Sequence, residues 1–395
     1  MRVLLVANTL PPADLSGVGE QVMQLAAGLR DAGHEVEVLG RGPGGARGPK
    51  LLFPLLVVPP FLRACRDFRP HVIQVHESDG AGAALLARAC GGLWDPVPLL
   101  VALLQVSYVE EMRAVRPLRA GREVLGRPGS AERRFRWTKA PLQVLLGWLT
   151  AWCADLVLTP SERTGDEVRR DYGAERTITL PNVKQTIAGH GAERPADEGF
   201  FLFVGRLRIR KGVEVLLAAL AARGEGGEDG GGPRLVIAGD GEHRAALERA
   251  AARFGVADRV DFLGRRSAGE VRSLLRRCRA LVVPSIYEGM PLVVLEAMEE
   301  GVPVVGSRVS GIPEVVSDRV TGWLVPPEDP GALAAALAEV RSDPEEARRR
   351  GRAGRERLDR RFRPAAAVAL WTRHVAAAAP GRAARPKPEA EESNE

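Results

Sequence analysis

The sequence predicts an α/β protein with two tandem domains, each built on a doubly wound parallel sheet. At 395 residues, the chain exceeds the length over which one hydrophobic core keeps growing, so two domains are expected. Short apolar segments alternate with helical patterns along the chain, which is typical of parallel sheets assembled from βαβ units. A polar stretch at 184–198 separates two such series and predicts a linker.

The first series opens on an apolar segment close to the N-terminus. Its expected strands are 3–7, 36–39, 72–75, 99–104, 156–159 and 178–180. Between the first two strands, apolar residues recur at helical spacing, and Gly33 suits the end of that helix. Those apolar residues are Val22, Leu25, Ala26 and Leu29. We therefore expect a first Rossmann-like domain over residues 1–186.

The second series predicts a second Rossmann-like domain over residues 187–363. Its expected strands are 200–204, 235–238, 260–263, 280–283, 303–305 and 323–325. A helix at 364–379, which contains Trp371, follows the last strand and can therefore pack outside this domain. The glycine-rich insert 224–232 predicts a flexible surface loop, and the tail 380–395 is predicted to be disordered.

The composition excludes several classes of protein. The four cysteines have no Cys-x-x-Cys spacing, so reduced thiols in a cytosol are expected rather than a zinc site or a disulfide framework. The apolar stretches 51–62 and 142–158 are shorter than the roughly 20 residues of a membrane span. The apolar N-terminus is too short for a signal peptide. We expect a cytoplasmic protein, either soluble or bound at the inner face of the cell membrane.

Two glutamates eight residues apart, Glu288 and Glu296, are the most informative feature of the second half. Pro291 suits the first position of a helix, which puts Glu288 in the preceding loop and Glu296 about one and a half turns inside. A carboxylate among the apolar neighbours of Glu296 is costly unless it accepts hydrogen bonds, and the diol of a ribose could supply them. The helix start also offers free N–H groups to an anion.

Two cations follow the strand 200–204. Arg206 leaves the strand end, and Lys211 is expected to open the next helix. A lysine there opposes the helix dipole, which favours a bound anion at that end. Ligands of such sheets bind outside the carboxyl ends of the strands, so these cations are predicted to hold a diphosphate. A solvated basic turn is the alternative.

Glycines mark two further loops. Gly17 and Gly19 open the first helix and allow a ligand to approach the backbone closely. Gly239 follows the strand 235–238 and suits contact with a nucleotide base. Neither loop has the third glycine of a dinucleotide fingerprint, so an ordinary tight turn is an alternative for both and a nicotinamide enzyme is not supported.

Together these motifs resemble the GT-B glycosyltransferases, and within them the large retaining family 4 (glycosyl transferases group 1), over nearly the whole chain. The segments that carry the resemblance are 16–20, 205–206 with 211–212, 239–241, 288–296 and 311–314. The resemblance implies a GT-B fold in which two domains face a cleft, a nucleotide-sugar donor, and a last helix that crosses back to the first domain.

The resemblance also implies roles for particular residues. Arg206 and Lys211 would bind the donor diphosphate, Glu296 the ribose hydroxyls, and Glu288 the transferred sugar. We therefore expect Glu288, Arg206 and Lys211 to be the catalytic residues. The expected donor-binding residues are Arg206, Lys211, Gly239, Gly289, Met290, Pro291, Leu292 and Glu296.

The sequence departs from this family in two places. Gln105 stands where similar enzymes commonly have a histidine, and glutamine can donate a hydrogen bond but cannot carry a proton. The segment 181–184 lacks the glycine and the acid that often follow an asparagine such as Asn182. The residues expected on the acceptor and phosphate side are Gly17, Gly19, Gln105 and His76, although a structural role is an alternative for His76.

The segment 113–139 is strongly basic, with nine arginines and lysines against two glutamates. It precedes an apolar stretch that contains Trp148 and Trp152. Such a basic, aromatic-flanked segment could dock on anionic lipid, so residues 113–152 are a candidate membrane surface; a solvated basic face is the alternative. No nucleic-acid recognition motif accompanies the charge, so a nucleic-acid partner is not expected.

We therefore expect a retaining glycosyltransferase that moves a sugar from a nucleotide-diphosphate donor to a glycan, lipid-linked or small-molecule acceptor. The donor would lie on the second domain and the acceptor on the first. No Asp-x-Asp motif is present, no cofactor or metal is expected, and fixed cations would stabilise the leaving diphosphate. Two alternatives stay open: a nucleotide-sugar epimerase or hydrolase of the same fold, and a catalytically degenerate paralogue that binds the donor.

Overall fold

A computed structural model describes residues 1–10, 17–41, 45–46, 48–95, 97–186, 194–195, 197–222 and 232–378. Ser16, most of the glycine-rich insert, part of the expected linker and the tail 380–395 lie outside the described residues. The chain divides into two compact units. The first unit contains Met1–Leu103, Leu149–Val157 and the residues from Val368, and the second contains Leu104–Trp148 and Leu158–Ala367.

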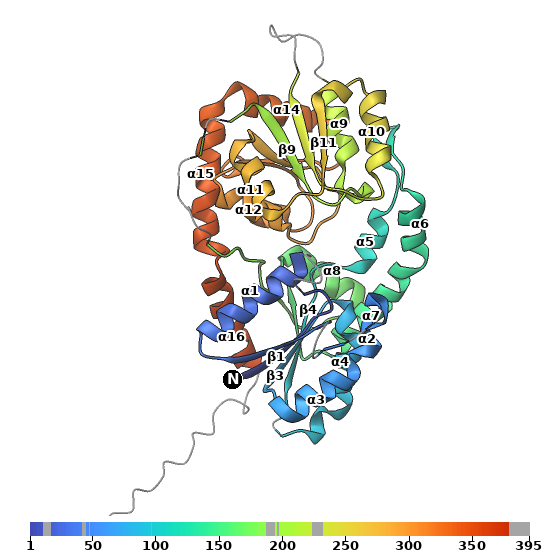
Figure 1. Cartoon of the computed structure of the whole chain (residues 1–395), viewed down its shortest axis with the longest axis vertical. Helices are drawn as coiled ribbons and strands as arrows, with labels where there is room; N and C mark the ends of the chain where they lie inside the picture. Colours follow the sequence, from blue (N-terminus) through green and yellow to red (C-terminus); the bar gives the residue numbers. More distant parts are fainter. Residues whose placement is uncertain are drawn as a thin grey trace, which may run out of the picture. The chain divides into compact units, whose positions relative to one another are not determined.

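The first parallel sheet has the strand order β2-β1-β3-β4-β7-β8. Its strands are β1 (Arg2–Val6), β2 (Glu35–Leu39), β3 (Val72–His76), β4 (Leu99–Leu103), β7 (Leu156–Thr159) and β8 (Thr177–Thr179). All residues of β3 and β4 are buried, as expected for parallel strands that are covered on both faces. Figure 1 shows β1, β3 and β4 with their helices.

Helices of the first unit follow the βαβ pattern that the sequence predicts. They are α1 (Gly17–Asp31), α2 (Phe53–Leu56), α3 (Val58–Phe68) and α4 (Ala81–Cys90), with the 3-10 turns η1 (Lys50–Leu52), η2 (Ser78–Gly80) and η3 (Gly91–Leu93). In α1 the four apolar residues expected to face the core are all buried. This burial explains why the 3.6-residue period was visible in the sequence.

The second parallel sheet has the order β11-β10-β9-β12-β13-β14. Its strands are β9 (Phe200–Val204), β10 (Arg234–Ala238), β11 (Val260–Gly264), β12 (Ala280–Val283), β13 (Val304–Ser307) and β14 (Gly322–Val325). Side chains of β9 alternate between two cores: Phe201 and Phe203 pack in one, Phe200 and Leu202 in the other. Both domains are therefore Rossmann-like, as the sequence predicts.

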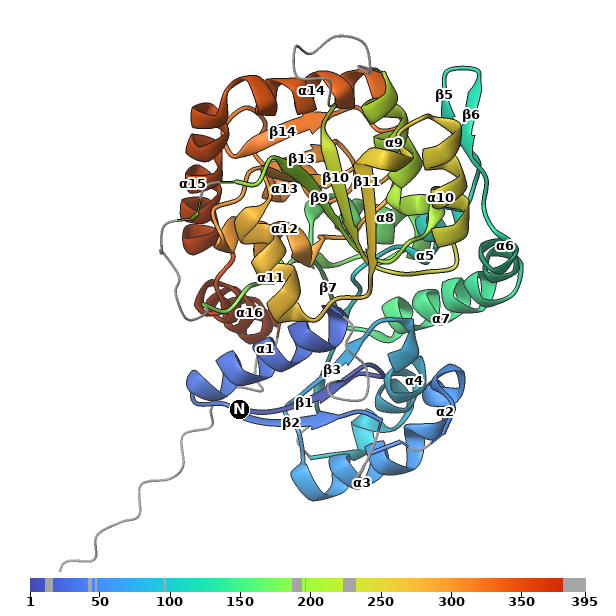
Figure 2. The ribbon, with the colours of Figure 1, turned by 45° about the horizontal axis from the view of Figure 1, so that its top comes forward.

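Helices cover both faces of this sheet (Figure 2). One core includes residues of α9 (Val213–Ala221), α10 (Arg244–Arg253) and α14 (Pro330–Ser342), and the other includes residues of α11 (Ala268–Arg277), α12 (Leu292–Glu299) and α15 (Pro344–Arg361). The remaining elements of this half are η4 (Ile209–Lys211), η5 (Ala257–Arg259) and α13 (Ile312–Val315).

An antiparallel hairpin inside the second unit was not predicted from the sequence. It joins β5 (Leu118–Ala120) to β6 (Glu123–Gly126), beside α9 and α10 in Figure 2. Leu118 and Leu125 are buried in the same core as α9, and Arg253 donates to the Leu125 carbonyl oxygen at 2.6 Å. The hairpin therefore contributes to the core of the unit that carries the second sheet.

Further helices lie on either side of the hairpin and at the end of the described chain. They are α5 (Tyr108–Ala114), α6 (Ser130–Trp137), α7 (Lys139–Cys153), α8 (Glu162–Tyr172) and α16 (Pro364–Ala378). In α16 the indole of Trp371 is fully buried and donates to Gln74 Oε1 at 2.7 Å. Among the described helices, none combines the length and the apolar character that a bilayer crossing would need.

Candidate functional site

The strand order of the second sheet creates a switch point between β9 and β12. The chain runs from β9 to β10 on one side, and later places β12 on the other side of β9. The loops that follow β9 and β12 therefore start at the carboxyl ends of neighbouring strands, and they lead to helices that pack in different cores, α9 and α12. In open α/β sheets this is where ligands bind.

Close backbone contacts hold these two loops together. Ile286 N donates to the Arg210 carbonyl oxygen at 2.9 Å. Gly212 has φ +66°, and a Cβ at this position would lie 2.1 Å from the Pro284 carbonyl oxygen. Only glycine fits both the left-handed backbone and this contact. The cationic loop after β9 is thereby fixed against the loop that carries Glu288.

Lys211 and Glu288 form an ion pair at this switch point. The Glu288 residue is 6% exposed, and its carboxylate also accepts from Ser285 Oγ at 2.8 Å. Burial alone raises the pKa of Glu288, but Lys211 and Arg210 outweigh it, so the net pKa lies below the usual value. Burial lowers the pKa of Lys211 below its usual value, although Glu288 opposes that effect.

The position of Lys211 corrects one expectation. Lys211 does not open α9: it ends the 3-10 turn η4, and Gly212 is the N-cap residue of the helix. A diphosphate beside this lysine stays a prediction, and the group that contacts the lysine in the fold is the carboxylate of Glu288. The lysine therefore does not face the dipole of α9 directly, and its charge is compensated from the loop after β12.

Glu296 is the fifth residue of α12, and it also lies beside a lysine. The helix begins at Leu292, one residue later than expected, and Pro291 is its N-cap. The Nζ of Lys184 lies 3.6 Å from Glu296 Oε1, and the two side chains are 16% and 27% exposed. Each glutamate of the pair that the sequence singled out is thus adjacent to an ammonium group.

Gln105, where one departure from the family pattern lies, contacts Asn182, the asparagine that precedes the other. Each side-chain amide donates to the oxygen of the other at 3.0 Å. Asn182 also donates to the Met290 carbonyl oxygen at 3.0 Å. A Cβ on Gly289 would lie 2.2 Å from the Gln105 carbonyl oxygen. Both residues therefore touch the Gly289–Met290 turn that precedes α12.

Arg206 and Gly239 lie at the carboxyl ends of neighbouring strands. Arg206 is exposed directly after β9. Gly239 has φ +157°, and a Cβ there would lie 1.8 Å from the Gly205 carbonyl oxygen. Glycine therefore permits the loops after β9 and β10 to approach closely, whether or not it also contacts a ligand.

The expected acceptor-side residues other than Gln105 lie in the first unit. Gly17 is the first residue of α1, and Gly19 is buried within that helix. His76 ends β3, is buried and forms a hydrogen bond with Gln74 at 3.0 Å. Burial lowers the pKa of His76 to about 3, so the ring is neutral at neutral pH. Its surroundings are those of a structural histidine.

A second cluster of buried charges supports the loop after β9. His243 contacts two carboxylates: its Nδ1 lies 3.3 Å from Glu132, and its Nε2 pairs with Glu214. Burial alone lowers the pKa of His243, but the two glutamates outweigh it and raise the pKa to about 9. Glu132 also accepts from Ile209 N at 2.7 Å. The cluster thus fixes η4, which ends in Lys211.

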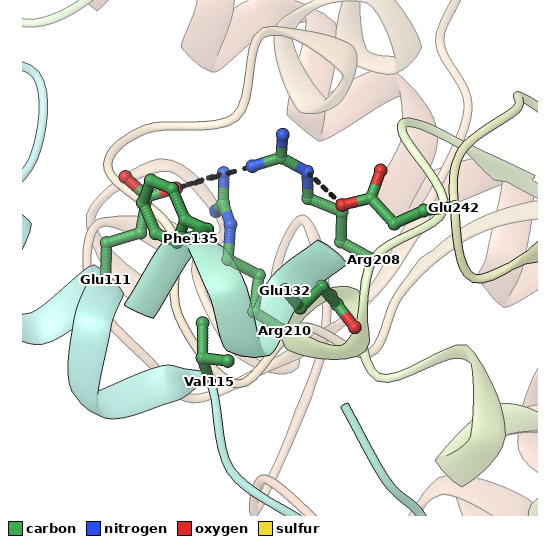
Figure 3. A pocket seen from close by; sticks show the side chains of 7 residues that line it. All are labelled: Glu111, Val115, Glu132, Phe135, Arg208, Arg210 and Glu242. Atoms are coloured by element: carbon green, nitrogen blue, oxygen red, sulfur yellow. Dashed lines mark ion pairs between the residues drawn. The ribbon is translucent and has the colours of Figure 1, made fainter. Parts of the chain in front are cut away.

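Figure 3 shows the pocket next to this cluster. It is lined by Glu111, Val115, Glu132, Phe135, Arg208, Arg210 and Glu242. Glu111 faces both guanidinium groups, at 3.3 Å from Arg210 and 3.8 Å from Arg208. Sequence reasoning missed these pairs. The basic run in the η4 loop was visible, but Glu111 lies about a hundred residues earlier on α5, and Glu242, 3.5 Å from Arg208, follows β10.

A buried tyrosine adjoins Glu288. The hydroxyl of Tyr287 accepts from Ser107 N at 2.8 Å and lies 3.2 Å from Glu167 Oε2. Burial, with a further contribution from Glu110, raises the pKa of Glu167 to about 7.

Within the described ranges, no group of three or more histidine, cysteine, aspartate or glutamate side chains is arranged to hold a metal ion.

Family models match the chain in two adjoining parts. Residues 16–183 match the glycosyl transferase 4-like domain, and residues 185–357 match glycosyl transferases group 1. Glycogen synthase of Mycobacterium tuberculosis is 29% identical, over 92% of this chain and 91% of its own length.

Solved structures show the same architecture. Sucrose-phosphate synthase from Thermosynechococcus elongatus superposes with a TM-score of 0.72 at 24% identity, covering 96% of this chain and 100% of that chain. HepE from Anabaena, solved with UDP-glucose, superposes with a TM-score of 0.68 at 19% identity, covering 95% of this chain and 100% of that chain.

The two Rossmann-like sheets and these superpositions show the GT-B fold, and the two family models show that the chain is a glycosyltransferase. The chain belongs to the group 1 glycosyltransferases.

Proposed function

We propose that this enzyme transfers a sugar from a nucleotide diphosphate sugar to a hydroxyl of a glycan, lipid-linked or small-molecule acceptor, with retention at the anomeric carbon. The observation that carries the proposal is the Lys211–Glu288 pair at the switch point of the second sheet. A cation and a carboxylate adjoin there, which suits a ligand with a diphosphate next to a hydroxyl-rich sugar.

In this proposal, the two residues of the ion pair bind different parts of the donor. Lys211 and the exposed Arg206 neutralise the diphosphate, and Glu288 accepts hydrogen bonds from the sugar hydroxyls. Glu296 accepts from the ribose. Fixed cations placed where charge develops on the leaving group lower the barrier because they need no reorganisation during the reaction.

The proposed chemical step is a same-face substitution. The bond between the anomeric carbon and the phosphate oxygen breaks, and the acceptor oxygen bonds to that carbon from the same side. The departing phosphate oxygen takes the acceptor's proton, so no side chain acts as nucleophile. We propose that the cations make a divalent metal unnecessary, and turnover should then be unchanged after treatment with a chelator.

The donor can be identified by a thermal-shift screen of uridine, guanosine and adenosine diphosphate sugars, followed by calorimetry with the hit. Lys211→Ala and Glu296→Ala should each weaken donor binding at least tenfold, as expected for the loss of a charged hydrogen-bond partner. Lys139→Ala, an exposed lysine on α7, is the control. Unchanged affinity in the first two variants would show that these residues are wrongly assigned.

Product analysis separates transfer from the alternatives. A glycosyltransferase forms a glycoside only when an acceptor is added, whereas a hydrolase or epimerase turns the donor over without one. Glu288→Gln keeps the shape of the side chain but removes its charge, so we expect slow transfer with retained donor affinity. Acceptor-independent turnover at the full rate would contradict the proposal.

We also propose that the enzyme works at the surface of an anionic membrane, with α6 and the start of α7 in contact with lipid. Trp137 is 76% exposed, and Leu142, Leu145 and Trp148 on α7 are 40%, 57% and 45% exposed. The three residues of α7 recur every third position, which places them on neighbouring turns of one side. An exposed apolar stripe with tryptophans suits the bilayer interface.

Charge around this stripe favours anionic lipid as the partner. Arg133, Arg134 and Lys139 are exposed, and none is ion-paired with a carboxylate of the described residues. Basic residues beside an apolar stripe each add about 1 kcal/mol of attraction to an anionic surface. Sedimentation with vesicles that contain phosphatidylglycerol should therefore exceed sedimentation with neutral vesicles, and should fall at high salt.

Variants locate the membrane contact. Trp148→Ser and the pair Arg133→Gln with Arg134→Gln should each reduce vesicle binding. The matched controls are Leu93→Ser, which is 86% exposed on η3, and an exposed arginine pair on α15, Arg348→Gln with Arg352→Gln. Equal binding by all variants would exclude this surface. Self-association without vesicle binding would assign it to a second copy instead.

A further inference from the structure

Lys184 has a backbone that is fixed on both sides. Its N–H donates to the Phe362 carbonyl oxygen at 2.9 Å, and its own carbonyl accepts from Arg363 at 3.1 Å. Arg363 is in turn ion-paired with Glu299 on α12 at 2.6 Å. The position of Lys184 relative to α12 is therefore set by the start of α16 and not by its side chain alone.

The segment that contains Lys184 contacts the predicted donor-binding residues at two points. Asn182 binds the Met290 carbonyl before α12, and Lys184 approaches Glu296, the fifth residue of that helix. The two contacts are made from one short stretch of chain. Residues 182–184 consequently run along the same edge of the second unit as residues 290–296.

Solvent reaches both charged groups of the Lys184–Glu296 pair. At 3.6 Å, Nζ and Oε1 are farther apart than in an ordinary hydrogen bond. The two side chains are 16% and 27% exposed, so a ligand can approach the ammonium and the carboxylate together.

We propose that Lys184 is a further donor-binding residue, which holds the ribose of the nucleotide together with Glu296. A ribose hydroxyl is both a donor and an acceptor: it can give its proton to the carboxylate and accept from the ammonium. The diol would thus be bound between two opposite charges. This inference rests on the proposed function, because it takes Glu296 as the ribose ligand.

The proposal predicts that Lys184 contributes to the distinction between ribose and dideoxyribose. The probes are UDP and 2′,3′-dideoxy-UDP, with the corresponding ADP and GDP pairs, measured by calorimetry on the whole chain. The wild type should prefer the ribonucleotide. Lys184→Met should lower affinity for the ribonucleotide about tenfold and leave affinity for the dideoxy compound nearly unchanged. The preference for ribose should therefore shrink.

Two further variants make the comparison specific. Arg348→Met removes an exposed cation from α15 and should bind both probes like the wild type. Lys184→Arg keeps a cation next to Glu296 and should retain part of the ribose preference. A thermal melt of each variant shows whether it is folded, and if Lys184→Met is not, Lys184→Gln takes its place in the same comparison.

The outcomes separate this inference from the proposed function. If the wild type binds none of the nucleotides, the proposed function fails and the inference fails with it. If the wild type binds but Lys184→Met keeps the full ribose preference, Lys184 is not a ribose ligand although the proposed function stands. Equal loss of both probes, or tighter binding of the ribonucleotide by Lys184→Met, would overturn the inference in the same way.

Discussion

Replacing His243 by glutamine removes the cation that is buried between Glu132 and Glu214. The histidine is 1% exposed, and the side chains of Glu132 and Glu214 are 4% and 2% exposed, so solvent screens these contacts little. The pKa of His243 is raised from 6.5 to about 9. Since one pKa unit corresponds to about 1.4 kcal/mol, the protonated histidine stabilises the fold by roughly 3 kcal/mol.

The sign of the pH dependence follows from the direction of this shift. Because the pKa of the folded state lies above 6.5, the stabilisation is complete below pH 6.5 and is lost as the pH rises through about 9. Wild-type stability should therefore decline over this interval. His243→Gln should cost about 3 kcal/mol near pH 6.5, and it should remove most of the decline.

Chemical unfolding followed by circular dichroism at the two ends of this interval measures the effect. His76→Gln is the matched control: this histidine is also buried, but its pKa of about 3 keeps it neutral throughout the interval. If His243→Gln retains the wild-type slope between pH 6.5 and about 9, the buried imidazolium is refuted as the source of this stabilisation.

Three further predictions concern the surroundings of the proposed donor site. Burial raises the pKa of Glu167 from 4.5 to about 7, so wild-type stability should fall as the pH rises between these values. In thermal melts over this pH range, Glu167→Gln should flatten the fall. An unchanged slope in the variant would contradict this prediction. Gly289→Ala should weaken donor binding at least tenfold in calorimetry, because the new Cβ would lie 2.2 Å from the Gln105 carbonyl oxygen. Gly269→Ala is the control: its new Cβ would have no atom within 4 Å, so the donor should bind normally. Gln105→Ala and Asn182→Ala should each cost about 1–3 kcal/mol of unfolding free energy, and strictly additive costs in the double variant would argue against the reciprocal amide pair.

Both sheets could be predicted from the sequence because hydrophobic burial leaves a period. Strands such as β3 and β4 are buried on both faces and appear as continuous apolar runs, and α1 shows its buried side every three or four residues. The β5–β6 hairpin was missed because its strands have only three and four residues and bury mainly Leu118 and Leu125. Two buried leucines in an arginine-rich segment produce no period.

The residues of the candidate site were visible as residue types, but their partners were not. Glu296 stands out because a charge among apolar neighbours is costly without compensation, and Lys211 because a lysine at an expected helix start opposes the helix dipole. Which cation compensates which acid depends on tertiary contacts, and Lys184 approaches Glu296 from more than a hundred positions away in the chain. Local patterns cannot show such a pairing. The buried cluster of Glu132, Glu214 and His243 was missed for the same reason.

Gln105 and Asn182 illustrate how a structure adds to the meaning of a sequence departure. Gln105 departs from the family pattern, and so do the residues that follow Asn182. In the fold they bind each other through both amides, and together they contact the turn at Gly289 and Met290. A histidine in place of Gln105 would present one ring nitrogen to Asn182 and could not form the two-bond amide pair. Gln105 and Asn182 therefore depend on each other physically, and a change at either position removes both hydrogen bonds of the pair.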